Sequence, residues 1–133
     1  MQKHTIISIL VSIAIIGGTL SFVSEKSATS ENSDVAPSEN VEMKHGVQYV
    51  TVIAQGGYSP RVSVVRPHIP TKLIVKTNGT YDCSASLVMR EAGFQKILQP
   101  TGEEIIDIGT LKEGDKIQGI CSMGMYNFQI TSR

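Results

Sequence analysis

The chain has 133 residues, enough for one domain and little else. Its 12 Lys and Arg balance its 12 Asp and Glu, and it contains no Trp, so it lacks the basic stripe and the aromatic platforms with which proteins bind nucleic acid. Its 2 cysteines are too few for a disulfide-rich mini-protein or for a four-thiolate zinc site.

An apolar segment near the N-terminus is the first predicted element. Ile6 to Val23 is a run of about 18 residues without a charge, which as a helix would span about 27 Å, close to the thickness of a hydrocarbon core. A cleaved signal peptide is the alternative, but Phe22 and Lys26 interrupt the most obvious small-x-small cleavage sites. We therefore predict an uncleaved transmembrane anchor over residues 1–24.

The charges on either side of this segment predict its orientation. Lys3 precedes it, and Glu25, Glu31 and Asp34 follow it. Because positive charge is retained on the cytoplasmic side, we expect a single-pass protein of the cell membrane with a cytoplasmic N-terminus and an extracellular C-terminal domain. A cleaved signal peptide would also place the rest of the chain outside the cytoplasm.

The next segment, residues 25–45, is rich in Ser, Glu, Asn and Ala and has no apolar period. Such a segment cannot bury enough surface to order itself, so we expect a flexible linker. Its root-mean-square span of about 25 Å would let a tethered domain reach neighbours at the membrane.

From Gly46 to the C-terminus, short alternating runs separated by Gly, Pro and Asn are typical of strands joined by tight turns. The predicted strands are 46–55, 61–64, 72–77, 83–89, 104–108, 116–121 and 126–130. This number of short strands fits two packed sheets. We predict an all-β domain over residues 46–133, a Greek-key β-sandwich preceded by one transmembrane helix and a disordered tether.

The segment Cys121-Ser122-Met123-Gly124-Met125 carries the most informative chemistry. It places one thiol and two thioethers at the junction of the last two predicted strands, and thiolate and thioether sulfurs select Cu(I) over harder divalent ions. A second thiol, Cys83, begins an earlier predicted strand. Cross-strand neighbours have Cβ atoms about 5 Å apart, so pairing of these two strands could bring both sulfurs onto one metal.

Two structural alternatives compete with a metal site. Cys83 and Cys121 could form a disulfide, which an extracytoplasmic position permits, although a disulfide gives no reason for Met-x-Met beside one partner. Met123 and Met125 could fill the core, because Met packs well into irregular gaps, although a Gly-containing loop is a poor place for core packing. Met89 lies about 20 Å along an extended strand from Cys83, and we predict that it belongs to the core.

The histidines lie away from the candidate sulfur ligands. His4 is at the membrane end, His45 is in the predicted linker and His68 is in a turn rich in Pro. A blue-copper electron-transfer site uses two His, one Cys and a weak axial Met, whereas the loop after Cys121 supplies Met. This pattern favours a site that holds Cu(I) over a redox centre.

No catalytic motif is present. The sequence has no nucleophile elbow, phosphate-binding Gly loop or His-Glu-x-x-His pair. Cys83 as a nucleophile would need a nearby base, and the sequence offers none. We predict that the protein is not an enzyme.

Three strings carry a family resemblance: Gly56-Gly57-Tyr58-Ser59-Pro60, Cys83-Ser84-Ala85-Ser86-Leu87-Val88 and Cys121-Ser122-Met123-Gly124-Met125-Tyr126. They resemble the cupredoxin-like domains of bacterial copper-handling proteins, and with an N-terminal anchor the chain looks most like the small membrane-anchored Cu(I) chaperones of streptococci and related Gram-positive bacteria. The resemblance implies a monomeric domain of cupredoxin type that binds one or two Cu(I) ions through Cys83, Cys121, Met123 and Met125.

The same resemblance implies transfer of Cu(I) by ligand exchange to the metal-binding domain of a copper-exporting P-type ATPase, as part of copper resistance. The cysteines would bind as thiolates, so the affinity should weaken as the pH falls. Three functions stay open at this point: a Cu(I) chaperone or buffer, an electron-transfer cupredoxin, and a disulfide-bonded interaction module without metal.

Overall fold

The computed structural model describes residues 37–133 of the chain. The predicted anchor, residues 1–24, lies outside this part, and so does the predicted linker up to residue 36. No helix within residues 37–133 is long and apolar enough to cross a membrane.

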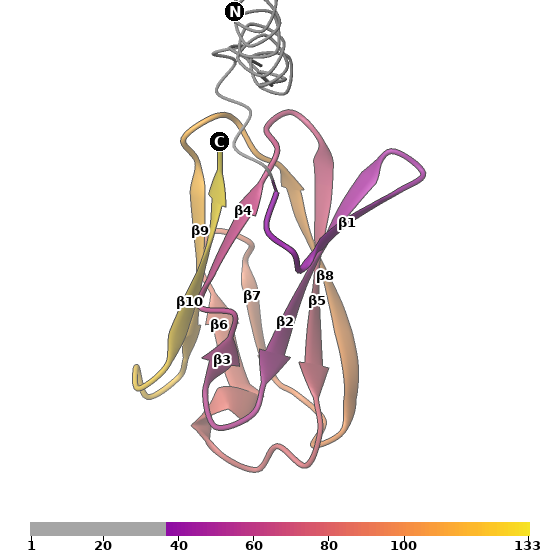
Figure 1. Ribbon diagram of the computed structural model, residues 1–133. Coiled ribbons are helices and arrows are strands. Elements are labelled where there is room, and N and C mark those ends of the chain that lie inside the picture. Colours follow the sequence, from indigo (N-terminus) through magenta and orange to yellow (C-terminus); the bar gives the residue numbers. More distant parts are fainter. Residues whose placement is uncertain (1–36) are drawn as a thin grey trace, which may run out of the picture. The chain divides into compact units, whose positions relative to one another are not determined.

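The described part consists of ten strands and one turn of 3₁₀ helix (Figure 1). In chain order the elements are β1 (Val41–Lys44), β2 (Val47–Ala54), β3 (Tyr58–Ser59), β4 (Val62–Val65), β5 (Pro70–Thr77), the 3₁₀ helix η2 (Cys83–Ala85), β6 (Ser86–Met89), β7 (Phe94–Ile97), β8 (Gly102–Thr110), β9 (Lys116–Cys121) and β10 (Asn127–Ser132). The predicted all-β class is confirmed.

The strands form two five-stranded sheets. The first has the order β1-β2-β5-β8, with β3 also paired to β2, and the second has the order β4-β10-β9-β6-β7. Each sheet contains one parallel pair, β2 with β5 and β4 with β10, and the other pairs are antiparallel. The parallel pairs were not predicted, because alternation of apolar residues does not report strand direction.

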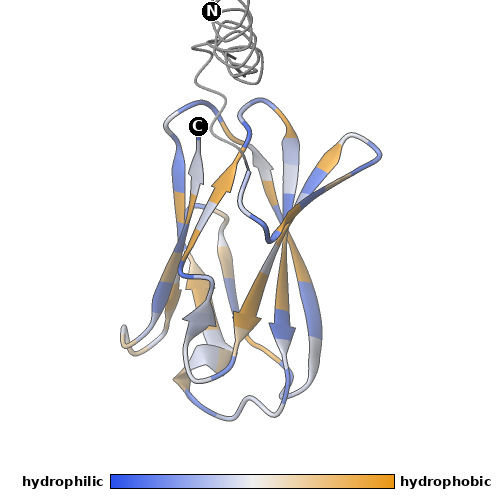
Figure 2. Cartoon of the chain, in the orientation of Figure 1, coloured by the Kyte–Doolittle hydropathy of each residue, from blue (hydrophilic) through white to orange (hydrophobic). Residues whose placement is uncertain are grey.

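Both sheets contribute to one hydrophobic core. Alternate residues of β2 and β5 are buried, among them Val50 and Leu73, and they share the core with Leu87 of β6 and Phe128 of β10. Figure 2 shows apolar and polar residues interleaved along the strands, as expected when successive side chains point to opposite faces of a sheet. Met89 is fully buried, which confirms the prediction that it belongs to the core.

Gly119 and Phe128 are paired across β9 and β10. A Cβ atom at residue 119 would overlap the Phe128 ring, and its distance to Cδ1 would be 2.9 Å. The Phe128 ring also packs edge-on against the ring of Tyr58, with 5.0 Å between the ring centroids. The close packing of Phe128 on Gly119 fixes the position of β9 near its end. Cys121, the last residue of this strand, is two residues further on.

The structure contains three short strands that the sequence did not predict: β1, β3 and β7. Strand β1 lies within residues 25–45, for which a linker was predicted, and pairs with β2. The burial patterns of β1 and β7 show no buried residue, and β3 has only 2 residues. Such strands are held by backbone pairing at sheet edges, so they leave no alternating apolar pattern in the sequence.

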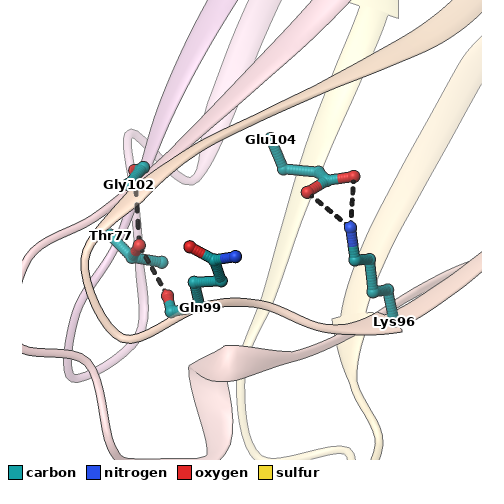
Figure 3. A network of polar contacts seen from close by, with 5 residues as sticks. All are labelled: Thr77, Lys96, Gln99, Gly102 and Glu104. Carbon is teal, nitrogen blue, oxygen red and sulfur yellow. Dashed lines mark hydrogen bonds and ion pairs between the residues drawn. The ribbon is translucent and has the colours of Figure 1, made fainter.

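Two loops close the end of the domain near the start of β8 (Figure 3). Thr77 Oγ1 donates to the carbonyl of Gln99 at 2.8 Å and to that of Gly102 at 3.3 Å, and Lys96 Nζ lies 2.9 Å from the Glu104 carboxylate. The backbone N–H of Thr80 donates to the carbonyl of Pro100 at 2.9 Å. The bonds of Thr77 and Thr80 fasten the segment that leads from β5 to η2, and the Lys96–Glu104 pair joins β7 to β8.

Candidate metal centre

The two cysteine sulfurs lie side by side. Cys83 Sγ is 2.6 Å from Cys121 Sγ, although the residues are 38 positions apart in the sequence, and both are free thiols. Cys83 is the first residue of η2, and Cys121 is the last residue of β9. Cys121 pairs across the sheet with Leu87 of β6, the strand that follows η2, and this pairing brings the two thiols together.

Cys83 was predicted to begin a strand, and this prediction is wrong. Residues Cys83–Ala85 form one turn of 3₁₀ helix capped by Asp82, and β6 starts only at Ser86. Because Asp82 accepts a hydrogen bond from the backbone N–H of Ser84, the chain turns before it pairs. The two thiols therefore meet at the end of a strand pair and are not themselves cross-strand partners.

The separation of the sulfurs decides what the pair can hold. Both cysteines are free thiols, and their sulfurs at 2.6 Å are closer than two ligands of one ion would be. Two thiolates on one soft ion would lie about 3.8 Å apart at a tetrahedral angle and about 4.6 Å apart in a linear arrangement, if each bond is about 2.3 Å as in zinc–thiolate sites. Binding of one ion therefore requires the sulfurs to separate by about 1–2 Å.

The surroundings give the two thiols different acidities. Burial raises the pKa of the Cys121 thiol, but the hydrogen bonds from Cys83 and from backbone N–H groups such as that of Tyr126, 3.4 Å from Sγ, outweigh it and lower the pKa overall. The hydrogen bond to Cys121, and partial burial, raise the pKa of Cys83. The hydrogen bond that Cys83 donates thus favours the thiolate at Cys121 over one at Cys83.

Met123 and Met125 lie on the loop that follows Cys121. Their exposed fractions are 75% and 65%, so neither fills the core, and the core-packing alternative is excluded for both. The loop turns at Gly124, whose φ of 73° is favourable for Gly, and the Gly124 N–H donates to the Cys121 carbonyl at 2.8 Å. The loop thus presents two exposed thioethers, two and four residues after Cys121.

Open space lies beside this loop. A pocket of about 300 Å³ is lined by Met125 and Tyr126 on one side and by Gly57 and Arg61 on the other. A Cβ atom at Gly57 would be 3.5 Å from the Tyr126 ring, so the loop between β2 and β3 packs directly against the end of the β9–β10 loop. The Met125 thioether therefore faces a region that another molecule can reach.

The two histidines within residues 37–133 take no part in this cluster. His45 is in the β1–β2 turn and His68 is in the β4–β5 turn, and Figure 1 shows the β4–β5 turn at the opposite end of the domain from the β9–β10 loop. Within residues 37–133 no group of three or more His, Cys, Asp and Glu side chains comes together. The part of the chain that is described thus lacks the two-His ligand set of a blue-copper centre.

Sequence reasoning missed the residues that hold Cys83 in place. Asp82 Oδ1 accepts from Ser84 N at 2.8 Å, and Asp82 Oδ2 accepts from Gly56 N at 2.9 Å. The bonds from Ser84 first, and then the one from Gly56, lower the pKa of Asp82. An Asp immediately before a predicted strand, followed by Ser two positions later, is a recognisable helix-cap signal.

Solved structures of other proteins have a similar fold, although comparisons of the sequence found no match. No protein-family profile and no curated protein sequence matches the chain. The metal-binding domain, with Cu(I), of the Cu(I)-exporting P-type ATPase CopA from Streptococcus pneumoniae D39 has a similar structure, with a TM-score of 0.61 and 20% sequence identity over 70% of this chain and 92% of that chain.

A copper-binding protein whose apo form was solved by NMR in solution is also similar. It has a TM-score of 0.61 and 22% identity, over 70% of this chain and 94% of that chain. At this level of identity the likeness concerns the fold. The domain of this chain therefore has a fold that copper-binding domains adopt.

Proposed function

We propose that this protein binds Cu(I) through Cys83 and Cys121, with Met123 and Met125 as further ligands, and that it serves as a membrane-anchored copper chaperone or buffer. The observation that carries the proposal is the pair of free thiols 2.6 Å apart at the base of an exposed thioether loop. The protein carries out ligand exchange and no bond-making catalysis.

The donor set favours Cu(I) on chemical grounds. Thiolate and thioether sulfurs are soft ligands, whereas calcium and magnesium require oxygen ligands and structural zinc sites usually have four ligands from Cys and His. Met123 and Met125 are neutral and exposed, at 75% and 65%. They suit a rim at which an ion is received or released, while the thiolates hold it more tightly.

The proposed partner is the metal-binding domain of a copper-exporting P-type ATPase. The similarity to such a domain, together with the cupredoxin-type strings of the sequence, supports a transfer between two sites of related chemistry. A transmembrane anchor over residues 1–24 and a flexible linker would raise the effective concentration of the domain near a membrane protein. Transfer requires both domains on the same side of the membrane, and the sequence charges favour the extracellular side for the C-terminal domain.

An anaerobic Cu(I) titration against a competing chelator tests the proposal. The unaltered chain should bind one or two ions tightly, and the double variant Met123→Leu/Met125→Leu should lose the weaker ion or bind Cu(I) about tenfold to a hundredfold less tightly. Leu keeps the apolar volume of Met and removes only the sulfur. Met43→Leu, at an exposed position of β1, is the matched control and should change nothing. Equal binding by the double variant and the unaltered chain would contradict a role for the loop.

The closeness of the sulfurs also suits a disulfide-bonded interaction module without metal. A count of free thiols in protein isolated under anaerobic conditions separates the two functions. The Cu(I) proposal predicts that both thiols are free, as they are in the structure. Two oxidised cysteines together with no Cu(I) uptake after reduction would favour the interaction module.

A further inference from the structure

The turn that carries Cys83 is tied to one neighbouring segment, residues 54–58, by three hydrogen bonds. Thr80 Oγ1 donates to the carbonyl of Ala54. The backbone N–H of Gly56 donates to Asp82 Oδ2 at 2.9 Å, and Tyr58 OH donates to the carbonyl of Ser84 at 3.0 Å. Residues on both sides of Cys83 are therefore fastened to the end of β2, to β3 and to the loop between them.

Asp82 makes the central one of these connections. One of its carboxylate oxygens accepts from the N–H and the hydroxyl of Ser84 and thereby caps η2. The other oxygen accepts from Gly56 N. Hydrogen bonds to an ionised carboxylate are about twice as strong as those between neutral groups, so this one side chain both shapes the turn and joins it to the β2–β3 loop.

The second thiol is held differently. Cys121 ends β9, which is paired with β10 and β6 and is fixed by the packing of Phe128 on Gly119. Cys83 lies in the 3₁₀ turn before β6. Its position, unlike that of Cys121, depends on side-chain hydrogen bonds. Loss of these bonds would leave Cys121 in place and allow Cys83 to move away from it.

We infer that Asp82 is a positioning residue for the thiol pair: through Gly56 and Ser84 it holds the Cys83 sulfur next to Cys121 and thereby sets the effective concentration of one thiol at the other. Cu(I) affinity depends on the same placement, and this second consequence rests on the proposed function. The first consequence, the pairing of the thiols, does not depend on copper.

The copper-free consequence is measured by equilibrating the protein with dithiothreitol and its oxidised form. In this exchange the two thiols become a disulfide, and one molecule of oxidised dithiothreitol becomes the dithiol, so protons and electrons balance. Asp82→Ala removes the cap and the bond to Gly56. It should lower the equilibrium constant for disulfide formation by about tenfold, the effect of one charge-assisted hydrogen bond.

Two further variants separate position from charge. Asp82→Asn keeps an oxygen for Ser84 but places an amide N–H against the N–H of Gly56. Its equilibrium constant for disulfide formation should therefore lie between those of the unaltered protein and Asp82→Ala. Asp82→Glu keeps the negative charge but places the carboxylate on a longer side chain. Its equilibrium constant for disulfide formation should also be lower than that of the unaltered protein. If Asp82→Glu behaves like the unaltered protein, Asp82 acts by charge alone and the inference is wrong.

Asp107 provides a matched control. Its Oδ1 also accepts from a backbone N–H two residues further on, that of Gly109, at 2.9 Å, but it lies at a bulge of β8, which belongs to the other sheet. Asp107→Asn should leave the thiol equilibrium unchanged. A folded Asp82→Ala protein whose constant changes by less than about twofold, or falls no more than that of Asp107→Asn, would overturn the inference.

The copper arm uses the same proteins in the anaerobic Cu(I) titration. Asp82→Ala should bind Cu(I) about tenfold more weakly, within the range found when outer-shell groups of metal sites are removed. Failure of the unaltered chain to bind Cu(I) refutes the proposed function and leaves the thiol equilibrium to decide the role of Asp82. A changed thiol equilibrium with unchanged Cu(I) affinity overturns the link from Asp82 to the metal.

Discussion

Replacement of Cys121 by Ser is expected to abolish tight Cu(I) binding. A Ser hydroxyl is a hard ligand that stays protonated at neutral pH, so the site would keep only one thiolate. Structural zinc sites with four ligands bind with about 10–16 kcal/mol, or roughly 2.5–4 kcal/mol per ligand, which corresponds to an affinity loss of about sixtyfold to a thousandfold for one ligand. Competition against a Cu(I) chelator under anaerobic conditions measures this loss.

The matched control for Cys121→Ser is Met89→Leu. Met89 is a fully buried sulfur residue on β6, so its replacement removes a sulfur from the core and leaves both thiols and the Met123–Met125 loop in place. It should keep the Cu(I) affinity of the unaltered chain. If Cys121→Ser binds Cu(I) as tightly as Met89→Leu does, the ion is held elsewhere and the proposed site is wrong.

The largest expected effect on stability is that of Gly119→Ala. The added Cβ would overlap the ring of Phe128, which is 1% exposed and lies between the sheets. The ring cannot turn aside without disturbing its contact with Tyr58. Overpacking of a core costs about 1–3 kcal/mol and occasionally more, and at this close a contact we expect about 3 kcal/mol or more. Denaturant unfolding monitored by circular dichroism measures the change.

A second substitution tests the cause. Phe128→Leu shortens the side chain that meets residue 119 and, by itself, costs about 1–2 kcal/mol because it leaves a cavity. In the double variant the smaller side chain makes room for the Ala methyl group, so the loss should be less than the sum of the two single losses. Strict additivity would show that the clash with Phe128 is not what destabilises Gly119→Ala.

Gly119→Ala should also weaken Cu(I) binding. Cys121 is two residues further along β9, and a shift of the strand end moves its sulfur relative to Cys83. The packing of the core and the placement of the thiols are therefore connected through one short strand.

The sequence predicted the parts of the fold that have an alternating pattern. The predicted strand 116–121 coincides with β9, Lys116–Cys121; every second residue of it is buried, and a Gly-containing turn follows it. The edge strands β1 and β7 were missed because no residue in them is buried. Their pairing is made by the backbone, which leaves little trace in the sequence.

The sequence predicted which residue types form the candidate site, but it did not predict the hydrogen bonds that position them. Thiol and thioether side chains close together in the sequence indicated soft-metal chemistry, and the loop position of Met123 and Met125 argued against core packing. The geometry around Cys83 was not predicted, since it depends on Asp82 bonding to Gly56, 26 residues away. Contacts of this kind follow from the tertiary fold and have no local pattern.

The most direct measurement for the central claim is X-ray absorption at the copper edge of the protein loaded anaerobically with Cu(I). A site made of Cys83, Cys121 and the neighbouring thioethers predicts a first shell of sulfur alone, at about 2.3 Å if the distance resembles that of zinc–thiolate bonds. A first shell with nitrogen or oxygen neighbours at about 2.0 Å would contradict it, because it would place His or carboxylate ligands on the ion.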